Sequence, residues 1–226
     1  MTEAEQAPER EGRRGRSRVL PLIGGAAAAA VLVAGGVFVW DRATGGYTSL
    51  TGDCEDLLPD DLPDRLPGTG DFDLRGGAAD PGEDGVLRLV HCEAAVPVDG
   101  GPADFSLQAV LYDPEEREGV RRMQAMVAEG QLEREADDFE LEYSNPPMRA
   151  VEWRSLSVGD GGYATVSRGQ EGEDPELWTS LEYSVANVRV SLFHQTAEPV
   201  EPLDSLEALE ALAEELVERL PELAGE

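Results

Sequence analysis

The sequence predicts an α+β fold in which an antiparallel sheet is flanked by helices as a layered sandwich, preceded by one N-terminal transmembrane helix. Three observations predict this: several short segments in which apolar and polar residues alternate, a strongly amphipathic stretch near the C-terminus, and 22 consecutive uncharged residues from Val19 to Trp40. Short connections favour antiparallel pairing of successive strands, and the apolar stripe of each helix must be buried against the sheet.

The chain divides into four predicted parts. Residues 1–18 are charged and lack apolar periodicity, as in a disordered tail, and residues 19–40 form the predicted transmembrane helix. Residues 41–53 are a Gly/Thr/Ser linker, and residues 54–226 form one α+β domain. A 22-residue helix is about 33 Å long, which is enough to cross a hydrocarbon core of about 30 Å.

The charges that flank the apolar segment predict its orientation. Five arginines precede the segment, whereas only Arg42 follows it closely, so the positive-inside rule places the N-terminus in the cytoplasm and residues 41–226 outside the cell membrane. A cleaved signal peptide is disfavoured because Trp40, Asp41 and Arg42 stand where small residues are needed. A lipoprotein is disfavoured because Cys54 lies too far from the segment.

The first half of the domain is predicted to contain a leucine-rich helix, two strands and a second helix. The first helix, from Leu57 to Leu66, is interrupted by prolines and breaks into two short turns. A Gly/Asp loop to Gly85 follows, and strands are then expected at Val86–Val96 and Phe105–Tyr112. Asp113 and Pro114 are typical of a helix start. The buried stripe expected for that helix is Val120, Met123, Met126 and Val127.

The second half is predicted to contain four strands and a closing helix, after an exposed acidic loop over residues 130–148. The strands are expected at Arg149–Val158, Tyr163–Ser167, Leu177–Val185 and Val188–Phe193. The last two strands form a hairpin at Ala186-Asn187, in which Asn187 tolerates the left-handed conformation. Asp204 and Glu207 match a capping box, and Pro221 ends the helix. One face of this helix carries Leu206, Leu209, Leu212, Leu216, Val217 and Leu220.

Two cysteines occur, Cys54 and Cys92, and both lie in the part predicted to be outside the cell. In an oxidising exterior the simplest interpretation is one disulfide, which would join the first helix to the sheet. The alternative is a catalytic thiol assisted by His91. Adjacent residues of a strand point to opposite faces, which disfavours this pairing with Cys92.

The composition restricts the class of partner. The formal net charge is −29. Of the 47 acidic residues, only Glu3, Glu5, Glu9 and Glu11 precede Trp40, and all the others follow it. Such a surface repels nucleic acid and anionic lipid, which leaves cations, basic proteins and basic peptides as electrostatically compatible partners. The alternative is an acidic surface that only maintains solubility.

The order of elements resembles a group of membrane-anchored or lipid-linked extracytoplasmic domains of unknown function found in actinobacteria. The resemblance covers about residues 54–220 and rests on Cys54 at the head of a leucine-rich helix, Cys92 in the first strand, the hairpin Tyr183–Phe193 and the closing helix Leu206–Leu220. These domains are similar to the PsbP and Mog1-like α/β/α sandwich, and distantly to the sensor domain of some mycobacterial kinases. The resemblance implies no catalytic residues.

The candidate metal sites in the sequence are weak. Asp71, Asp73 and Gly76 match three positions of an EF-hand loop, but Arg75 and Gly82 occupy positions that require oxygen ligands. Two other acidic groups offer looser oxygen sites: Asp80, Glu83 and Asp84, and Glu171, Glu173 and Asp174. His91 and His194 lack the spacing of a zinc site. We therefore expect no metal and no cofactor.

The sequence favours a non-enzymatic binding module of the cell envelope, held by one membrane span and contacting an envelope protein or a small ligand. It contains no Gly-x-Ser-x-Gly elbow, phosphate-binding glycine loop or His-Glu-x-x-His motif. A pair of carboxylates for glycan hydrolysis cannot be identified from the sequence, because among 47 acidic residues some pair will always lie close together. The alternatives are a cell-wall-directed enzyme, and a ligand-sensing subunit that acts through a membrane partner.

Overall fold

The computed structural model describes residues 46–67, 73–98, 101–135, 140–141, 148–169, 176–197 and 200–225. These residues form an α+β fold with an antiparallel sheet and helices, which confirms the predicted fold class for this part of the chain. The predicted transmembrane helix from Val19 to Trp40 lies outside the described residues. Among the helices that are described, none combines the length and the apolar character needed to cross a membrane.

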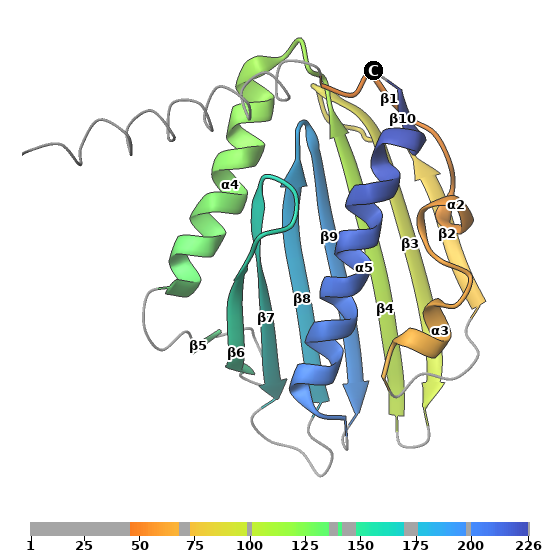
Figure 1. The fold of residues 1–226 in the computed structure, drawn as a ribbon, viewed down its shortest axis with the longest axis vertical. Helices are drawn as coiled ribbons and strands as arrows, with labels where there is room; N and C mark the ends of the chain where they lie inside the picture. Colours follow the sequence, from red (N-terminus) through yellow and green to blue (C-terminus); the bar gives the residue numbers. More distant parts are fainter. Residues whose placement is uncertain are drawn as a thin grey trace, which may run out of the picture. The chain divides into compact units, whose positions relative to one another are not determined.

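The described strands of the main sheet have the order β2-β3-β4-β9-β8-β7-β6-β5, and every neighbouring pair is antiparallel (Figure 1). Their bounds are β2 (Asp73–Ala79), β3 (Val86–Val98), β4 (Gly101–Tyr112), β5 (Glu140–Leu141), β6 (Met148–Leu156), β7 (Gly161–Gly169), β8 (Glu176–Val185) and β9 (Val188–Ala197). The connection from β4 to β6 runs through α4 (Arg117–Glu135), which places β9 beside β4 in the middle of the sheet.

Helix α5 (Pro202–Leu223) packs along one face of the sheet and forms the main core with it (Figure 1). Its leucine stripe is buried as predicted, except that Val217 is only partly buried. The opposing strand residues alternate in the same way, so that the odd-numbered residues Leu177, Thr179, Leu181 and Tyr183 of β8 face the helix. The inward-facing side chains of the strands and the apolar stripe of α5 thus pack together in one apolar layer.

Both ends of α5 differ from the prediction. The helix begins with Pro202 at its first position and Glu201 as the N-cap, so Asp204 lies inside the first turn and is not the capping residue. Proline at the first helical position loses no hydrogen bond, which explains the earlier start. At the other end Pro221 does not terminate the helix, which continues to Leu223.

Two short helices cover the same face beside α5. They are α2 (Cys54–Leu57) and α3 (Leu62–Arg65), which confirms the prediction that the prolines divide this leucine-rich segment into two turns. Leu57, Leu58, Leu62 and Leu66 are all buried against the sheet and α5.

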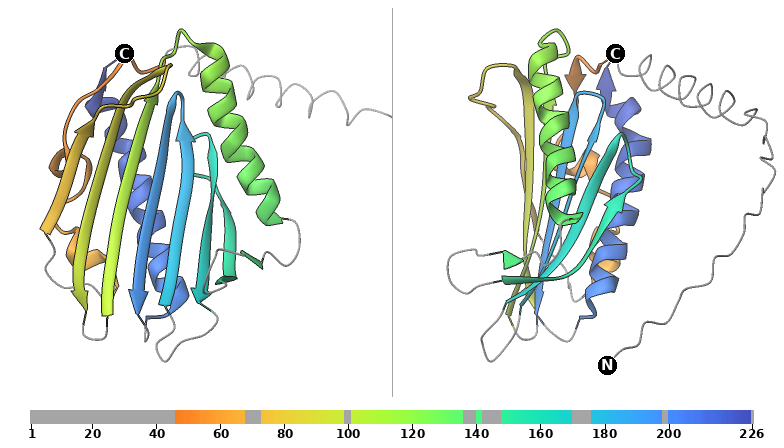
Figure 2. Two further views of the ribbon diagram at one scale, coloured as in Figure 1. Left: turned by 180° about the vertical axis from the view of Figure 1, so that it is seen from behind. Right: turned by 90° about the vertical axis from the view of Figure 1, so that its left-hand side faces the viewer.

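Helix α4 packs on the opposite face of the sheet, over β7 and β8 (Figure 2). A Cβ atom added to Gly130 would lie 2.6 Å from Cε1 of Tyr163, which shows how closely the helix approaches β7. The predicted start at Asp113 and Pro114 is wrong by about one turn, because the Asp113 side chain accepts a hydrogen bond from the Glu115 amide and forms a turn ahead of the helix. Helix α4 continues to Glu135, inside the segment predicted to be a loop.

The buried stripe predicted for α4 is only partly correct. Met123 and Val127 are buried and Val120 is partly buried, whereas Met126 is 42 % exposed. Because α4 covers only part of its face of the sheet, its contact stripe is narrower than that of α5.

The prediction of a loop before Gly85 is wrong for residues 73–79, which form strand β2. The strand pairs with β3 in continuous register from Asp73 opposite Ala95 to Ala79 opposite Leu89. Gly76 has a φ of +113°, and a Cβ atom there would lie 2.0 Å from the carbonyl oxygen of His91. Glycine therefore lets the edge strand approach β3 closely.

The predicted hairpin between β8 and β9 is present, but the roles of its two turn residues are exchanged. Ala186, and not Asn187, has the positive φ, at 52°. The Asn187 side chain is buried and binds three backbone groups, those of Tyr47 (N–H and C=O) and Tyr112 (C=O). Through these bonds Asn187 connects the β8–β9 turn to the entering segment at Tyr47 and to the end of β4 at Tyr112.

A second, two-stranded sheet joins the two ends of the described domain. It consists of β1 (Ser49–Leu50), inside the predicted linker, and β10 (Ala224–Gly225). The Thr48 amide donates to the Gly225 carbonyl at 2.8 Å, and the Thr51 amide donates to the Leu223 carbonyl at 2.7 Å. The chain that enters the domain is thus fastened to its C-terminus.

Candidate functional site

The two faces of the main sheet are covered to different extents. One face packs against α2, α3 and α5, whereas α4 is the only described helix on the other face and lies over β7 and β8 (Figure 2). Helix α4 contacts the β8–β9 hairpin near its turn, where Gln124 binds Ala186 and Met126 binds Arg189. In the described part of the chain no helix lies over β3, β4 or the ends of β8 and β9 away from that turn (Figure 2). We call this uncovered area the open face.

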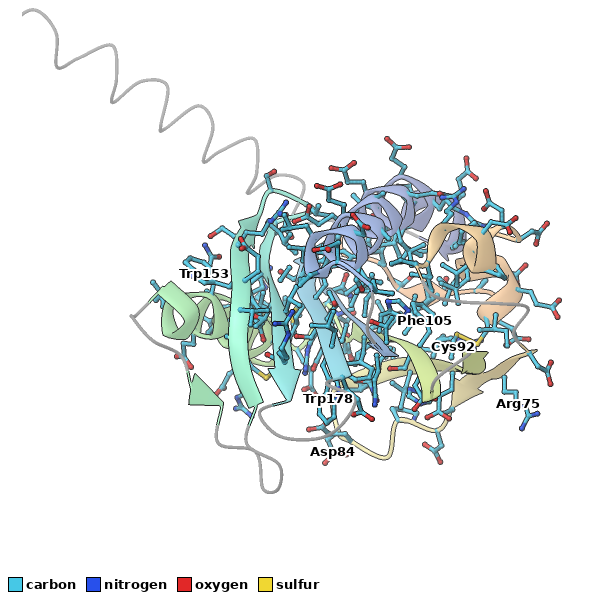
Figure 3. The ribbon with its side chains drawn as sticks, turned by 90° about the horizontal axis from the view of Figure 1, so that it is seen from below. Arg75, Asp84, Cys92, Phe105, Trp153 and Trp178 are labelled. Carbon is cyan, nitrogen blue, oxygen red and sulfur yellow. A yellow bond between two sulfur atoms is a disulfide. The ribbon has the colours of Figure 1, made fainter. Side chains whose placement is uncertain are left out.

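The alternation along β8 and β9 places four side chains at the open face as one group. In β8, Leu177 and Thr179 point toward α5, so Glu176 and Trp178 point to the opposite face. In β9, His194 points toward α5, so its neighbours Phe193 and Gln195 point to that same opposite face. All four are partly exposed. Figure 3 shows Trp178 on the side of the sheet away from α5. We name Glu176, Trp178, Phe193 and Gln195 the open-face cluster.

Hydrogen bonds and a ring contact join these four side chains into a unit. The indole Nε1 of Trp178 donates to Oε2 of Glu176 at 3.1 Å, and Nε2 of Gln195 donates to the same oxygen at 2.9 Å. The rings of Trp178 and Phe193 meet edge to face, with centroids 6.1 Å apart and an interplanar angle of 78°. The carboxylate and the indole are therefore held in fixed relative positions.

Small hydroxyl residues surround the cluster on the neighbouring strands. Ser180 and Ser106 are the cross-strand neighbours of Phe193, and Ser167 is that of Trp178. Short side chains beside large aromatic rings leave the ring faces accessible from the side. The open-face cluster thus combines aromatic surface, hydrogen-bonding groups and one carboxylate.

A charged pair on this face lies between β8 and β9. Arg189 Nε lies 2.9 Å from Oε1 of Glu182, and the hydroxyl of Tyr163 donates to Oε2 of the same carboxylate at 2.8 Å. Among the described residues, no arginine lies within ion-pair distance of Glu176. The Glu176 carboxylate therefore accepts hydrogen bonds from neutral donors but has no cationic partner among the described residues.

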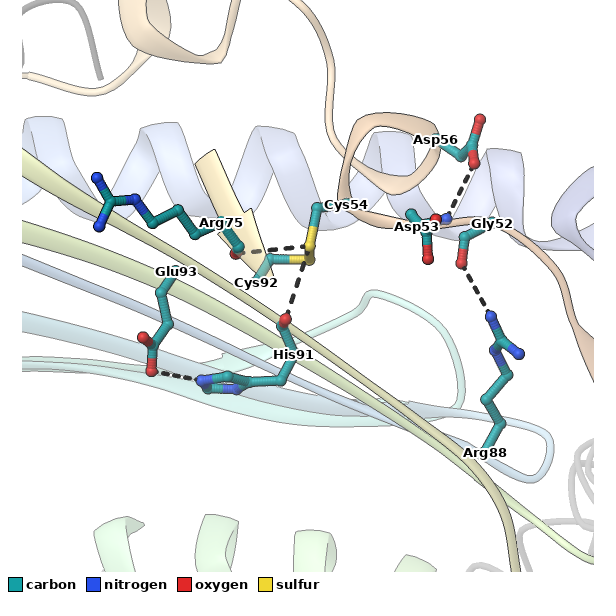
Figure 4. Close-up of a disulfide and its surroundings, with 9 residues drawn as sticks. All are labelled: Gly52, Asp53, Cys54, Asp56, Arg75, Arg88, His91, Cys92 and Glu93. Atoms are coloured by element: carbon teal, nitrogen blue, oxygen red, sulfur yellow. Dashed lines mark hydrogen bonds and ion pairs between the residues drawn. A yellow bond between two sulfur atoms is a disulfide. The ribbon is translucent and has the colours of Figure 1, made fainter. Parts of the chain in front are cut away.

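The predicted disulfide is present. The Sγ atoms of Cys54 and Cys92 are bonded, with the Cα atoms 5.6 Å apart, and the bond joins α2 to β3 on the helix-covered side (Figure 4). The neighbouring His91 points to the open face, where its Nε2 lies 2.6 Å from Oε1 of Glu93. The opposite directions of residues 91 and 92 agree with the alternation expected of a strand.

The structure does not bring the candidate metal ligands together. His194 is fully buried on the helix-covered face, so the two histidines lie on opposite faces of the sheet. Asp73 and Gly76 belong to β2 and not to a loop, and Asp73 pairs with Arg75 at 3.2 Å. Among the described residues no group of three or more His, Cys, Asp or Glu is placed to hold a metal ion.

The two looser acidic groups have different outcomes. Oδ1 of Asp80 accepts a hydrogen bond from the Gly82 amide at 3.2 Å, as in a simple turn, and Asp80, Glu83 and Asp84 are not among the described residues placed to hold a metal ion. The group Glu171, Glu173 and Asp174, like Asp71, lies outside the described residues.

The sequence interpretation missed the open-face cluster, although a signal was present. In the alternating segment from Glu176 to Val185, Trp178 occupies a position of the polar phase, and Phe193 does the same in the next strand. Two aromatic residues on the polar side of a hairpin indicate a second surface with a role of its own.

No protein-family model, no curated protein and no solved structure matches the chain.

Proposed function

We propose that this protein is a non-enzymatic binding module of the cell envelope, anchored by one membrane span, whose extracytoplasmic domain contacts an envelope protein through the open face of its sheet. The observation that carries the proposal is the open-face cluster, in which two aromatic rings and a fixed carboxylate are partly exposed. Aromatic side chains contribute strongly to protein interfaces because they bury much area with few rotatable bonds.

The membrane anchor and the outward orientation are part of the proposal. The uncharged segment from Val19 to Trp40 and the arginines before it support both. The disulfide between Cys54 and Cys92 also supports an extracytoplasmic domain, because disulfides persist in oxidising compartments. We extend the proposal to kinship with the anchored extracytoplasmic domains that the order of elements resembles.

The position of the cluster within the domain supports a role in contacting other molecules. The segment that follows the proposed span enters at Tyr47, whose backbone binds Asn187 in the β8–β9 turn. Trp178 lies seven residues before the end of β8 at Val185, which corresponds to about 23 Å along the strand. The cluster therefore lies at the end of the hairpin opposite the turn to which the entering segment is bonded.

Site-specific photo-crosslinking in living cells tests this proposal. A photoreactive phenylalanine analogue replaces Ser106, beside Phe193 on the open face, and in a matched control it replaces Glu218, an exposed residue of α5. We expect discrete adducts with an envelope protein from position 106 only, and their loss in the Trp178→Leu background. Adducts of equal yield from both positions, or none from either, would contradict the proposal.

A further inference from the structure

We infer that the open-face cluster recognises an arginine side chain of a polypeptide partner, with the guanidinium stacked on Trp178 and paired with the carboxylate of Glu176. This inference rests on the proposed function and names the chemistry of the partner. Two features carry it: the unbalanced charge of Glu176, and the aromatic ring fixed beside that charge.

The Glu176 carboxylate is oriented but not neutralised. Both of its hydrogen-bond donors, the indole N–H of Trp178 and the amide of Gln195, are uncharged and converge on Oε2. A carboxylate accepts about four hydrogen bonds, so capacity for a further donor remains, including all of Oε1. Two other partly buried carboxylates of the described domain, by contrast, are paired with arginine: Glu182 with Arg189 at 2.9 Å and Glu210 with Arg154 at 3.0 Å.

The aromatic half of the cluster is suited to a planar cation. Phe193 meets Trp178 edge to face, which fixes the indole, and the Trp178 N–H is already bound to Glu176. Tryptophan has the most attractive ring face for a cation, and guanidinium stacks on such rings more often than ammonium does. A guanidinium above the indole could also donate to the adjacent carboxylate, whereas an ammonium offers no planar surface for stacking.

Charge complementarity favours a cationic partner over a neutral glycan or an anion. Asp104, the exposed cross-strand neighbour of Gln195, adds a second carboxylate at the edge of the cluster, and Glu93 lies on the same face with its side chain 68 % exposed. The chain as a whole has a formal charge of −29 and attracts basic polypeptides over long range. A sugar ring could stack on Trp178 and donate its hydroxyls to Glu176, but a neutral sugar would gain nothing from the long-range field of the acidic chain.

Calorimetric titration with two matched peptides tests the inference. The full-length chain is reconstituted in nanodiscs of neutral phosphatidylcholine, so that the bilayer separates its own arginine-rich N-terminus from the domain and does not attract the peptides. The first peptide contains three Gly-Ser-Arg repeats, and in the second citrulline, the neutral isostere, replaces each arginine. Glu176→Gln removes the charge but keeps an acceptor for Trp178, Trp178→Leu removes the ring, and Glu218→Gln is the control for loss of one acidic charge.

We expect the arginine peptide to bind the native chain and the Glu218→Gln variant with equal Kd, and the citrulline peptide to bind about tenfold more weakly or not at all. Glu176→Gln and Trp178→Leu should each weaken the arginine peptide by about tenfold or more. Equal binding of the two peptides, or unchanged binding to Glu176→Gln, would overturn the inference in favour of a neutral ligand or of general attraction to the acidic surface. Circular dichroism melting confirms that each variant is folded.

The crosslinking experiment separates a failure of this inference from a failure of the proposed function. If adducts from position 106 persist while the arginine peptide does not bind, the open face contacts a partner of other chemistry, and only the inference fails. If the adducts are absent as well, the proposed function fails with it.

Discussion

Nδ1 of His194 lies 2.8 Å from the hydroxyl oxygen of Ser205, and both side chains are fully buried between β9 and α5. Ser205 belongs to the first turns of α5, so this hydrogen bond joins the start of the helix to the sheet. Among the described residues, His194 Nε2 and the hydroxyls of Thr179 and Thr196 have no hydrogen-bond partner. Burial lowers the pKa of His194 to about 4, so its ring is neutral at physiological pH.

This burial predicts that acid destabilises the domain through His194. The ordinary pKa of histidine, 6.5, applies in the unfolded chain, which therefore binds a proton that the folded state excludes. The contribution to stability is complete above about pH 6.5 and is lost as the pH falls toward 4, by about 3 kcal/mol in total. Urea denaturation in neutral detergent at pH 7, 5.5 and 4, followed by tryptophan fluorescence, measures this loss.

The many carboxylates also titrate in this range, so the His194→Gln variant supplies the reference. We expect the stability difference between the native chain and the variant to shrink by about 3 kcal/mol from pH 7 to pH 4. A difference that does not change with pH would show that His194 does not bind the proton on unfolding.

The hydrogen bond itself predicts a cost for removing the Ser205 hydroxyl. Ser205→Ala leaves a buried imidazole nitrogen without a partner, so we expect the free energy of unfolding to fall by about 2 kcal/mol. Ser157→Ala, at an exposed position, is the matched control and should change it by less than about 0.5 kcal/mol. Urea denaturation at pH 7 measures both variants, and equal losses in the two would indicate that the bond contributes nothing specific.

Periodicity in the sequence was sufficient to predict the parts of the fold that pack on the main core. The leucine stripe of α5 and the alternation in β8 and β9 specify which residues meet, because each apolar set has only one way to be buried. The disulfide was predicted from a different observation, the presence of two cysteines in the part expected to lie outside the cell. The sequence disfavoured a metal site at His194, but it did not predict the contact with Ser205, since a sequence does not show that a polar residue points inward opposite that serine.

Features that depend on contacts between distant segments were not predictable in this way. Strand β2 has little alternation and exists through pairing with β3, helped by the absence of a side chain at Gly76. The positive φ at Ala186 follows from the use of the Asn187 side chain to bind Tyr47 and Tyr112. The open-face cluster needs two strands in register to bring Glu176 beside Gln195, which neither strand shows alone.

The disulfide predicts a large and local loss of stability when it is removed. Its closed loop has a sequence separation of 38 residues, so the double variant Cys54→Ala and Cys92→Ala should be destabilised by about 4 kcal/mol in the chain-entropy model. Hydrogen exchange should accelerate first in α2 and β2, which lie at the edge of the sheet beside the bond. Urea denaturation with hydrogen exchange checks both expectations, and loss of protection that starts in β8 and β9 would contradict the local part.

Asn187 predicts how firmly the entering chain is held. Its amide forms three hydrogen bonds with backbone groups of Tyr47 and Tyr112 while only 2 % exposed, so Asn187→Ala should reduce the free energy of unfolding by about 3 kcal/mol. Gln124→Ala is the matched control, because that amide makes one bond to the same turn, to the Ala186 carbonyl at 3.1 Å, and should cost about 1 kcal/mol. The Tyr47 amide, which donates to Asn187, should lose its exchange protection in the first variant and keep it in the control. If Tyr47 stays protected in Asn187→Ala, the pairing of β1 with β10 alone holds the entering segment.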